Sequence, residues 1–265
     1  MAKSVYRADI DGLRAIAVVG VVAYHLRPTL LPGGFLGVDV FFVISGFLIT
    51  AILSREFATG GFSLWRFYER RLRRIGPALI TVLLITSALA TAVLLPVDLI
   101  GFARSLLATL GFVSNIYFWR DTDYFSRAAA EKPRLHTWSL GIEEQFYILF
   151  PMLLFVGYRI GLRAVPLIVA VVTLGSLAAT VVALKIGAGL PAFYLLPTRA
   201  WELGAGALIV FATPWPDREV VVREIVAAVA LLVIVAALAI NPVRLLGLLP
   251  PALLPVAATA GLIAI

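Results

Sequence analysis

Hydrophobic runs of roughly 20 residues, the length of an α-helix that crosses a bilayer core, recur along the chain between short polar segments. The pattern predicts apolar segments at residues 10–27, 35–54, 76–95, 99–118, 138–157, 164–184, 193–212, 221–240 and from about 245. The runs are long and do not alternate with polar residues, which excludes the strands of a membrane barrel. We therefore expect an all-α fold, a polytopic transmembrane helical bundle with about eight or nine membrane segments.

Two of these segments depart from the simple pattern. The segment 99–118 contains Arg104 and Asn115 and follows Asp98, so that it is either a full span or a re-entrant element. The distribution of Lys and Arg favours the full span. The last run stops inside apolar sequence, so we expect an incomplete helix there and a single transmembrane domain, 1–265, truncated at its C-terminal end.

Composition supports an integral membrane protein. The chain is 62% hydrophobic and 14% charged, with a mean hydropathy of +1.01, values outside the range of soluble domains. The net charge of +7 comes from basic residues in short loops, which is typical of membrane topology, and we expect no nucleic-acid partner. The absence of cysteine excludes disulfides and thiolate chemistry, and with two histidines we expect no metal.

The basic residues also predict an orientation. Lys3 and Arg7 precede the first segment, and six arginines follow the second. Because cytoplasmic loops are enriched in Lys and Arg, both regions are expected on the cytoplasmic side. We expect an integral protein of the plasma (inner) membrane with a cytoplasmic N-terminus, in contact with membrane lipid.

Charged groups inside the first two segments are the first candidate site. Arg14, His25 and Asp39 lie where lipid tolerates charge poorly, so each is expected to face a protein interior or a wet cavity. Arg14 and His25 are eleven residues apart, which on a helix places them about 20° and about 16 Å from each other. Histidine changes protonation near neutral pH, so His25 is a candidate general base.

A cluster of arginines precedes the third segment and has two interpretations. Its members are Arg70, Arg71, Arg73 and Arg74. They either anchor the topology and pair with anionic lipid, or they bind a phosphorylated donor, because the guanidinium fork matches phosphate oxygens. The residues alone leave both interpretations open.

Two more segments combine polar and apolar residues. In residues 133–151 the residues Glu143, Glu144 and Gln145 stand together at the head of an apolar run. In residues 195–210, Arg199 and Glu202 are three apart on one helical face, where they can pair. This pair is either a structural ion pair or part of a polar wall. Gly204 and Gly206 beside it permit close helix approach.

Together these elements resemble the acyltransferase-3 family of integral membrane acyltransferases. The resemblance rests on Arg-x10-His at 14–25, followed by GGFLGVDVFFVISGFLIT, and on Trp-Ser-Leu-x-x-Glu-x-Gln-Phe-Tyr at 138–147. Arg-x-x-Arg occurs at 71–74 and at 70–73, and Arg-x-x-Glu at 199–202. The resemblance implies about ten spans and a fused or separate extracytoplasmic transferase domain, so that this chain is a part of a longer arrangement.

The resemblance also implies a reaction and roles for residues. An acyl group, most simply acetyl, moves from cytoplasmic acyl-coenzyme A to a hydroxyl of an extracytoplasmic carbohydrate or glycolipid. The implied catalytic residues are His25, Glu143 (with Glu144 as its substitute) and Asp39; the donor-binding residues are Arg14, Arg70, Arg71, Arg73 and Arg74; the acceptor-binding residues are Trp138, Ser139, Gln145, Tyr147, Arg199 and Glu202. Direct transfer and a covalent acyl-enzyme on His25 or Ser45 both stay open.

Two other functions compete with acyl transfer. A proton-coupled transporter would also have buried titratable groups, and a structural or regulatory membrane subunit would need none of the chemistry. Transporters commonly have related halves. The elements around His25 and Asp39 have no second copy in the chain, and the resemblance favours the acyltransferase.

Overall fold

The computed structural model describes residues 7–121, 135–212, 220–240 and 249–265. Within these ranges the chain is largely helical and contains no β-strand, which confirms the predicted all-α class. Lys3, on which the predicted orientation partly depends, lies outside the described residues, as does the start of the last apolar run.

The chain divides into two compact units. Unit 1 comprises Met1–Ile52, Gly161–Ala188 and Pro197–Ile265, and unit 2 comprises Leu53–Ile160 and Gly189–Leu196. We describe each unit by itself.

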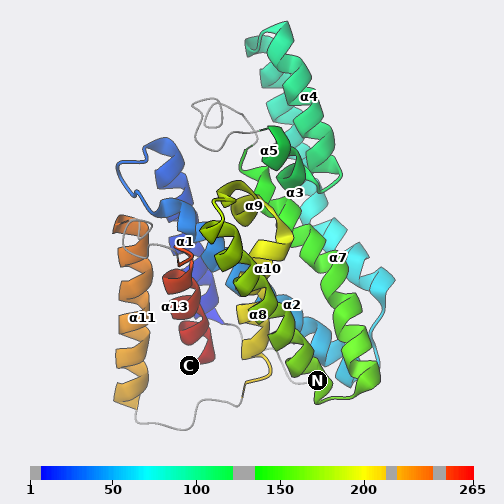
Figure 1. Cartoon of the computed structure of the whole chain (residues 1–265). Helices are drawn as coiled ribbons and strands as arrows, with labels where there is room; N and C mark the ends of the chain where they lie inside the picture. The colour runs from blue at the N-terminus through cyan, green and yellow to red at the C-terminus, as the bar shows by residue number, and fades with distance from the viewer. Residues whose placement is uncertain (1–6, 122–134, 213–219, 241–248) are drawn as a thin grey trace. The chain divides into compact units, whose positions relative to one another are not determined.

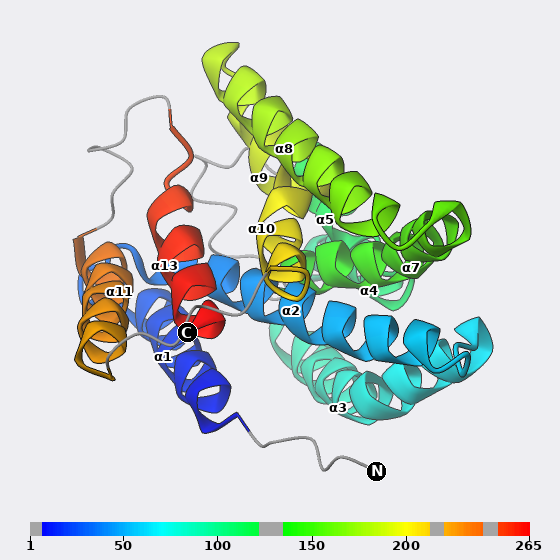
Figure 2. The ribbon, with the colours of Figure 1, turned by 90° about the horizontal axis from the view of Figure 1, so that it is seen from below.

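Unit 1 is an assembly of apolar helices around a buried core. Its elements are α1 (Ala8–Leu26), η1 (Gly34–Leu36), most of α2 (Gly37–Ala58), α8 (Ala164–Lys185), most of α10 (Leu196–Ile209), α11 (Val220–Ile240) and α13 (Leu253–Ala264). In Figures 1 and 2, α13 lies beside α11, and both contribute to the core that α1 also lines. Leu13, Val40, Trp201, Ile234 and Val256 are fully or almost fully buried in this core.

Small residues bring α2 and α10 into direct backbone contact. A methyl group built on Gly46 would lie 1.8 Å from the carbonyl oxygen of Leu203, and one built on Gly206 would lie 1.9 Å from that of Val43. On the other face of α10, a methyl group on Gly204 would lie 2.1 Å from the hydroxyl of Thr173. The predicted close approach at Gly204 and Gly206 is therefore confirmed, and it places the polar residues of α10 against α2.

Replacing Gly206 with alanine is expected to destabilise unit 1. The added methyl group meets a backbone carbonyl that no rotamer change can move, so α2 and α10 must separate, at a cost of about 1–3 kcal/mol. Thermal unfolding of the purified protein in detergent measures the loss. Gly175→Ala is the matched control, since a methyl group there has nothing within 4 Å and alanine favours the helix. Equal melting temperatures for the two variants would contradict the close contact.

Unit 2 is built on the helices that contain the arginine cluster and the 138–147 segment. Its elements are α3 (Leu64–Val93), α4 (Pro96–Leu110), α5 (Ser114–Asp121), α7 (Thr137–Ile160) and α9 (Gly189–Tyr194), together with the end of α2. The helix α5 contacts α4, α7 and α9 (Figure 1). Unit 2 thus packs α4, α5 and α9 against α7.

The structure revises the limits of two predicted segments in unit 2. The segment 99–118 is not one helix, because α4 ends at Leu110 and α5 begins at Ser114 after a turn in which Phe112 has a positive φ of 54°. The arginine cluster does not lie in a loop: α3 begins at Leu64, with the Ser63 hydroxyl accepting a hydrogen bond from the backbone N–H of Arg66. Arginine is a good helix former, so a polar segment extends the apolar helix.

Five of the described helices are long and apolar enough to cross a membrane. They are Gly34–Ala58, Leu64–Val93, Thr137–Ile160, Ala164–Lys185 and Val220–Ile240. The protein is thus an integral membrane protein, whereas the predicted count of eight or nine segments is not confirmed. The segment 193–212 is also divided, because α9 ends at Tyr194 and α10 begins at Leu196, with Pro197 in its first turn.

Candidate active site

His25 and Arg14 lie on one continuous helix, α1, as predicted. The Nδ1 atom of His25 is 2.8 Å from the carbonyl oxygen of Val21, one turn earlier. Since a carbonyl oxygen only accepts hydrogen bonds, Nδ1 carries the hydrogen and the lone pair of the neutral ring is on Nε2. The His25 side chain is exposed, and the arrangement leaves Nε2 as the atom that can take a proton. Arg14 pairs with Asp11 at 3.1 Å.

Asp39 belongs to a buried group of three ionisable residues in unit 1. Arg199 donates to the Asp39 carboxylate with Nη2 and lies 2.9 Å from the Glu202 carboxylate with Nη1. The exposed fractions of the three residues are 2% for Asp39, 8% for Arg199 and 0% for Glu202. One guanidinium therefore faces two carboxyl groups in a site without solvent access.

This group shows how Arg199 and Glu202 are paired, whereas their role toward a substrate stays a prediction. The ion pair between residues three apart is confirmed, and the structure adds Asp39 of α2 as its third member. Within the described residues, no hydrogen bond or ion pair joins Asp39 to His25: Asp39 pairs with Arg199, and His25 with the Val21 carbonyl. The arrangement links α2 to α10 through charge as well as through the glycine contacts.

Unit 2 contains a second group, formed by Arg71, Glu144 and Tyr147. The Nη2 atom of Arg71 is 3.5 Å from Glu144 Oε1, and its guanidinium carbon lies 3.7 Å from the centre of the Tyr147 ring. Glu144 and Tyr147 are three residues apart on α7, so they present one face to α3. The stacked, paired guanidinium orients both side chains.

The four arginines of the cluster are not equivalent. Only the side chain of Arg71, 18% exposed, turns toward the interior of unit 2. Arg70 pairs with Glu56 at 2.5 Å and Arg73 pairs with Glu69 at 2.7 Å, and both are at least half exposed. Arg74 is exposed and has no ion-pair partner among the described residues. It is the arginine most available to an anion.

The remaining predicted residues lie along the first turns of α7. Trp138 is buried against Phe193 and Tyr194 of α9, with ring centres 4.5 and 5.8 Å away. Ser139 donates to the carbonyl oxygen of His136 at 3.2 Å, and Glu143 is half-buried. The roles of these residues toward a substrate stay predictions.

Sequence reasoning missed the partner of Gln145. Its side-chain amide is paired with that of Asn115, thirty positions earlier on α5. The only signal in the sequence was a polar residue, Asn115, inside an apolar run.

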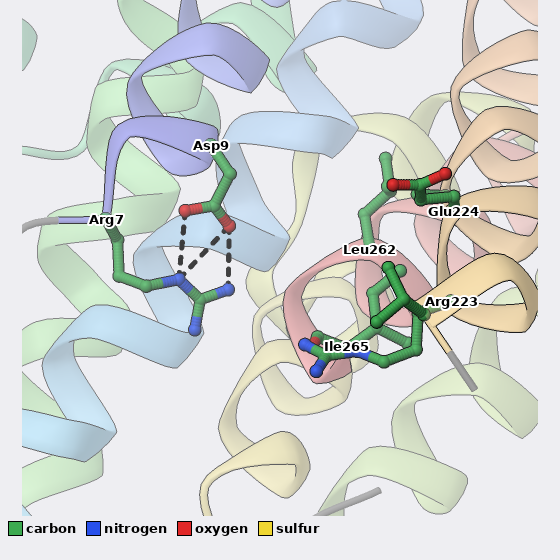
Figure 3. A pocket seen from close by; sticks show the side chains of 8 residues that line it. Arg7, Asp9, Arg223, Glu224, Leu262 and Ile265 are labelled. Carbon is green, nitrogen blue, oxygen red and sulfur yellow. Dashed lines mark hydrogen bonds and ion pairs between the residues drawn. The ribbon is translucent and has the colours of Figure 1, made fainter. Parts of the chain in front are cut away.

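A pocket in unit 1 lies apart from the predicted residues (Figure 3). Its lining includes Arg7, Asp9, Arg223, Glu224 and Ile265. The hydrogen bonds between Arg7 and Asp9 lower the pKa of Asp9 and raise that of Arg7, so the pair is ionised at neutral pH. None of the predicted site residues lines this pocket, and the described ranges contain no group of three His, Asp or Glu side chains able to hold a metal ion.

Comparison with known proteins extends these observations. The chain matches the family model of an acyltransferase domain, acyltransferase-3, over residues 7–264. It is 40% identical over 215 residues to the O-acetyltransferase OatA of Staphylococcus aureus (strain NCTC 8325 / PS 47), a match covering 80% of this chain and 35% of the relative. It is 47% identical over 151 residues to the putative O-acetyltransferase SAS0844 of Staphylococcus aureus (strain MSSA476), covering 56% of this chain and 25% of the relative.

The matches cover most of this chain but only a part of each curated relative. The chain spans about a third of the length of the curated OatA relatives, at 35%. No solved structure matches. The family match, in contrast, includes residues of both units and every predicted site residue.

Proposed function

Because this chain belongs to the acyltransferase-3 family, we propose that it transfers an acetyl group from cytoplasmic acetyl-coenzyme A to a hydroxyl of an extracytoplasmic glycan or glycolipid. The observation that carries the proposal is the family match over residues 7–264, together with relatives that are named O-acetyltransferases. The exposed side chains of His25 and Arg74 support it, because acyl transfer needs a base and a phosphate-bearing donor needs cations.

The proposed reaction is a single displacement at the thioester. His25 Nε2 removes the proton of the acceptor hydroxyl as the hydroxyl oxygen attacks the thioester carbonyl. The new C–O bond forms, the C–S bond breaks, and the coenzyme A thiolate leaves and is protonated by the imidazolium. The hydrogen bond from Nδ1 to the Val21 carbonyl fixes the ring and stabilises the imidazolium during the step. The reaction is balanced without a metal or an oxidant.

The arginine cluster is proposed to bind the donor. Coenzyme A carries a pyrophosphate and a 3′-phosphate, and the exposed guanidinium of Arg74 and the neighbouring Arg73 can pair with these groups. Arg71 faces Glu144 and Tyr147, so its contribution is to hold the end of the site nearest to α7.

The proposed roles of Arg74 and Arg71 can be separated in a binding experiment. Arg74→Gln is expected to weaken acetyl-coenzyme A binding about 10–100-fold with an unchanged melting temperature, since a charge-assisted phosphate contact contributes about 1.5–3 kcal/mol. Arg71→Gln is expected to lower both the affinity and the melting temperature, because Glu144 loses its partner. Calorimetric titration of the purified protein measures the affinity. The double variant Arg55→Gln/Arg66→Gln removes exposed arginines nearby and serves as the control. If Arg74→Gln binds the donor like this control, the cluster is a topology anchor.

The proposed function is tested with the purified chain in lipid nanodiscs. Labelled acetyl-coenzyme A is the donor, and octyl β-glucoside, a soluble glycolipid with free hydroxyls, is the acceptor. We expect coenzyme A release that depends on the acceptor, and an acetyl ester of the glucoside in the mass spectrum. If no ester forms, while the protein in sealed vesicles moves protons with a solute, the transporter interpretation replaces the proposal.

A further inference from the structure

The N-terminal half of α7 is held in place by a network of side-chain hydrogen bonds that was not predicted from the sequence. Asn115 of α5 is completely buried, and its side-chain amide meets that of Gln145 in a reciprocal pair. Gln145 donates to Asn115 Oδ1 at 2.7 Å, and Asn115 donates to Gln145 Oε1 at 3.3 Å. Each amide group therefore both donates a hydrogen bond to the other and accepts one from it.

The second hydrogen of each amide reaches a backbone carbonyl on a different element. Asn115 donates to the carbonyl oxygen of Tyr194, at the end of α9, at 3.0 Å. Gln145 donates to the carbonyl oxygen of Phe112, in the turn between α4 and α5, also at 3.0 Å. Two amide side chains thus connect α5, α7, α9 and the 111–113 turn.

The turn at Phe112 is strained, and the network holds it. A φ of 54° is rare for a phenylalanine, because its Cβ crowds the backbone there. Backbone strain of this kind persists only where surrounding contacts impose it, and it is concentrated near functional sites. The contact that reaches this residue's carbonyl is the Gln145 amide.

The sequence of α7 is adapted to the network. Gly141 is one turn before Gln145, and a methyl group there would lie 2.8 Å from Asn115 Oδ1 and 3.2 Å from the Ser114 hydroxyl. Ser114 in turn donates to the carbonyl oxygen of Thr137 at 2.7 Å. The face of α7 that contains residues 137, 141 and 145 is therefore fixed against α5.

Fixing this face also fixes the opposite one. On a helix, Tyr147 projects about 200° from Gln145, and Glu144 about 100° from it, so both turn away from α5. They are the side chains that meet Arg71 of α3. Any rotation of α7 about its axis moves them relative to that guanidinium.

We propose that Asn115 is a positioning residue of the acyltransferase: it sets the rotation of α7 through Gln145 and so places Glu144 and Tyr147 against Arg71. The inference deepens the proposed function and rests on it for its catalytic consequence. It gives Gln145, expected from the sequence to touch the acceptor, a role inside the protein instead. The effect of Asn115 on the orientation of α7 can be tested without an activity assay. Because the chain has no cysteine, pairs of cysteines can be introduced and crosslinked selectively.

A crosslinking experiment reads the orientation of α7 directly. The Tyr68 hydroxyl donates to the Ile148 carbonyl at 3.0 Å, so cysteines replacing Tyr68 and Ile148 report the α3–α7 contact with a short bismaleimide reagent. Asn115→Ala is expected to slow this crosslink about tenfold, because a rotated α7 turns the cysteine at position 148 away from the cysteine at position 68. Cysteines replacing Phe57 and Tyr158, whose rings stack at 4.6 Å, form the control pair and are expected to react at an unchanged rate.

Kinetics provide the second measurement. Asn115→Ala is expected to lower kcat about tenfold or more, with a smaller loss of apparent affinity for acetyl-coenzyme A, because Arg71 stays on α3 but is less well held by Glu144 and Tyr147. Asn115→Asp, which keeps the size but loses both donated hydrogen bonds, is expected to behave like Asn115→Ala. If Asn115→Ala lowers only the melting temperature, with the 68–148 crosslink and kcat per folded molecule unchanged, the proposal is overturned. If the unmodified chain transfers no acetyl group, the crosslinking result still decides the positioning role.

Discussion

The His25→Gln variant is expected to lose acetyl transfer almost completely, with kcat lower by about 10²–10⁴. Glutamine is close to histidine in size and can hydrogen-bond, but it cannot take a proton from the acceptor hydroxyl. The affinity for acetyl-coenzyme A is expected to stay the same, because in the proposed mechanism the base acts in the transition state and the phosphate contacts already exist in the ground state. The rate of ester formation and a calorimetric titration of the donor measure the two effects separately.

The chain supplies a matched control for this experiment. His136 is the second of its two histidines; it is exposed, and its backbone carbonyl accepts the Ser139 hydroxyl. His136→Gln is expected to retain turnover. Near-full activity of His25→Gln would show that general-base catalysis by this residue is wrong. A solute-moving protein whose His25 variant loses only its pH dependence would favour the transporter.

The Arg199→Gln variant is expected to lose about 3–5 kcal/mol of stability, the usual cost of removing one partner from a buried ion pair. The substitution leaves Asp39 and Glu202, 2% and 0% exposed, facing each other without a cation. Arg199→Lys is expected to restore part of the loss, because one ammonium cannot contact two carboxylates with a fork. Thermal unfolding in detergent, monitored by the loss of monodisperse protein, ranks the variants by stability.

A second substitution separates charge from packing. Glu202→Gln alone leaves one guanidinium with one carboxylate, so we expect a change of about 1 kcal/mol or less. Adding it to Arg199→Gln is expected to recover part of the lost stability, since only one uncompensated carboxylate remains. Arg163→Gln, at an exposed position of the same unit, is the control for loss of one arginine. If Arg199→Gln unfolds at the temperature of Arg163→Gln, the buried group contributes nothing.

Helices that are apolar all round were predictable to within a residue or two. The segments 164–184 and 221–240 correspond to Ala164–Lys185 and Val220–Ile240, because a continuous apolar run bounded by charges has one placement in a membrane. The break at Phe112 was not predictable in the same way. Phenylalanine carries no turn signal, and the contact that reaches its carbonyl comes from Gln145, thirty-three residues later.

The candidate site was predictable where its members are neighbours in sequence. The pair of Arg199 and Glu202 follows from helical spacing and is confirmed. Asp39 is 160 positions from Arg199, and Glu144 is 73 from Arg71, so no local pattern specifies these contacts. The four arginines look alike in the sequence, and only the fold distinguishes Arg71 from the others, by turning it toward α7.

The continuity of α3 has a mechanical consequence. Its 30 residues form a rod of about 45 Å, longer than the hydrocarbon core of about 30 Å. Because Arg70 to Arg74 are part of this rod and not of a flexible loop, their height above the lipid is set by how the apolar part of α3 matches the bilayer. If these arginines bind the donor as proposed, membrane thickness becomes a variable of donor binding: a thicker bilayer brings the guanidinium groups closer to the headgroups, and a thinner one moves them further into the aqueous phase.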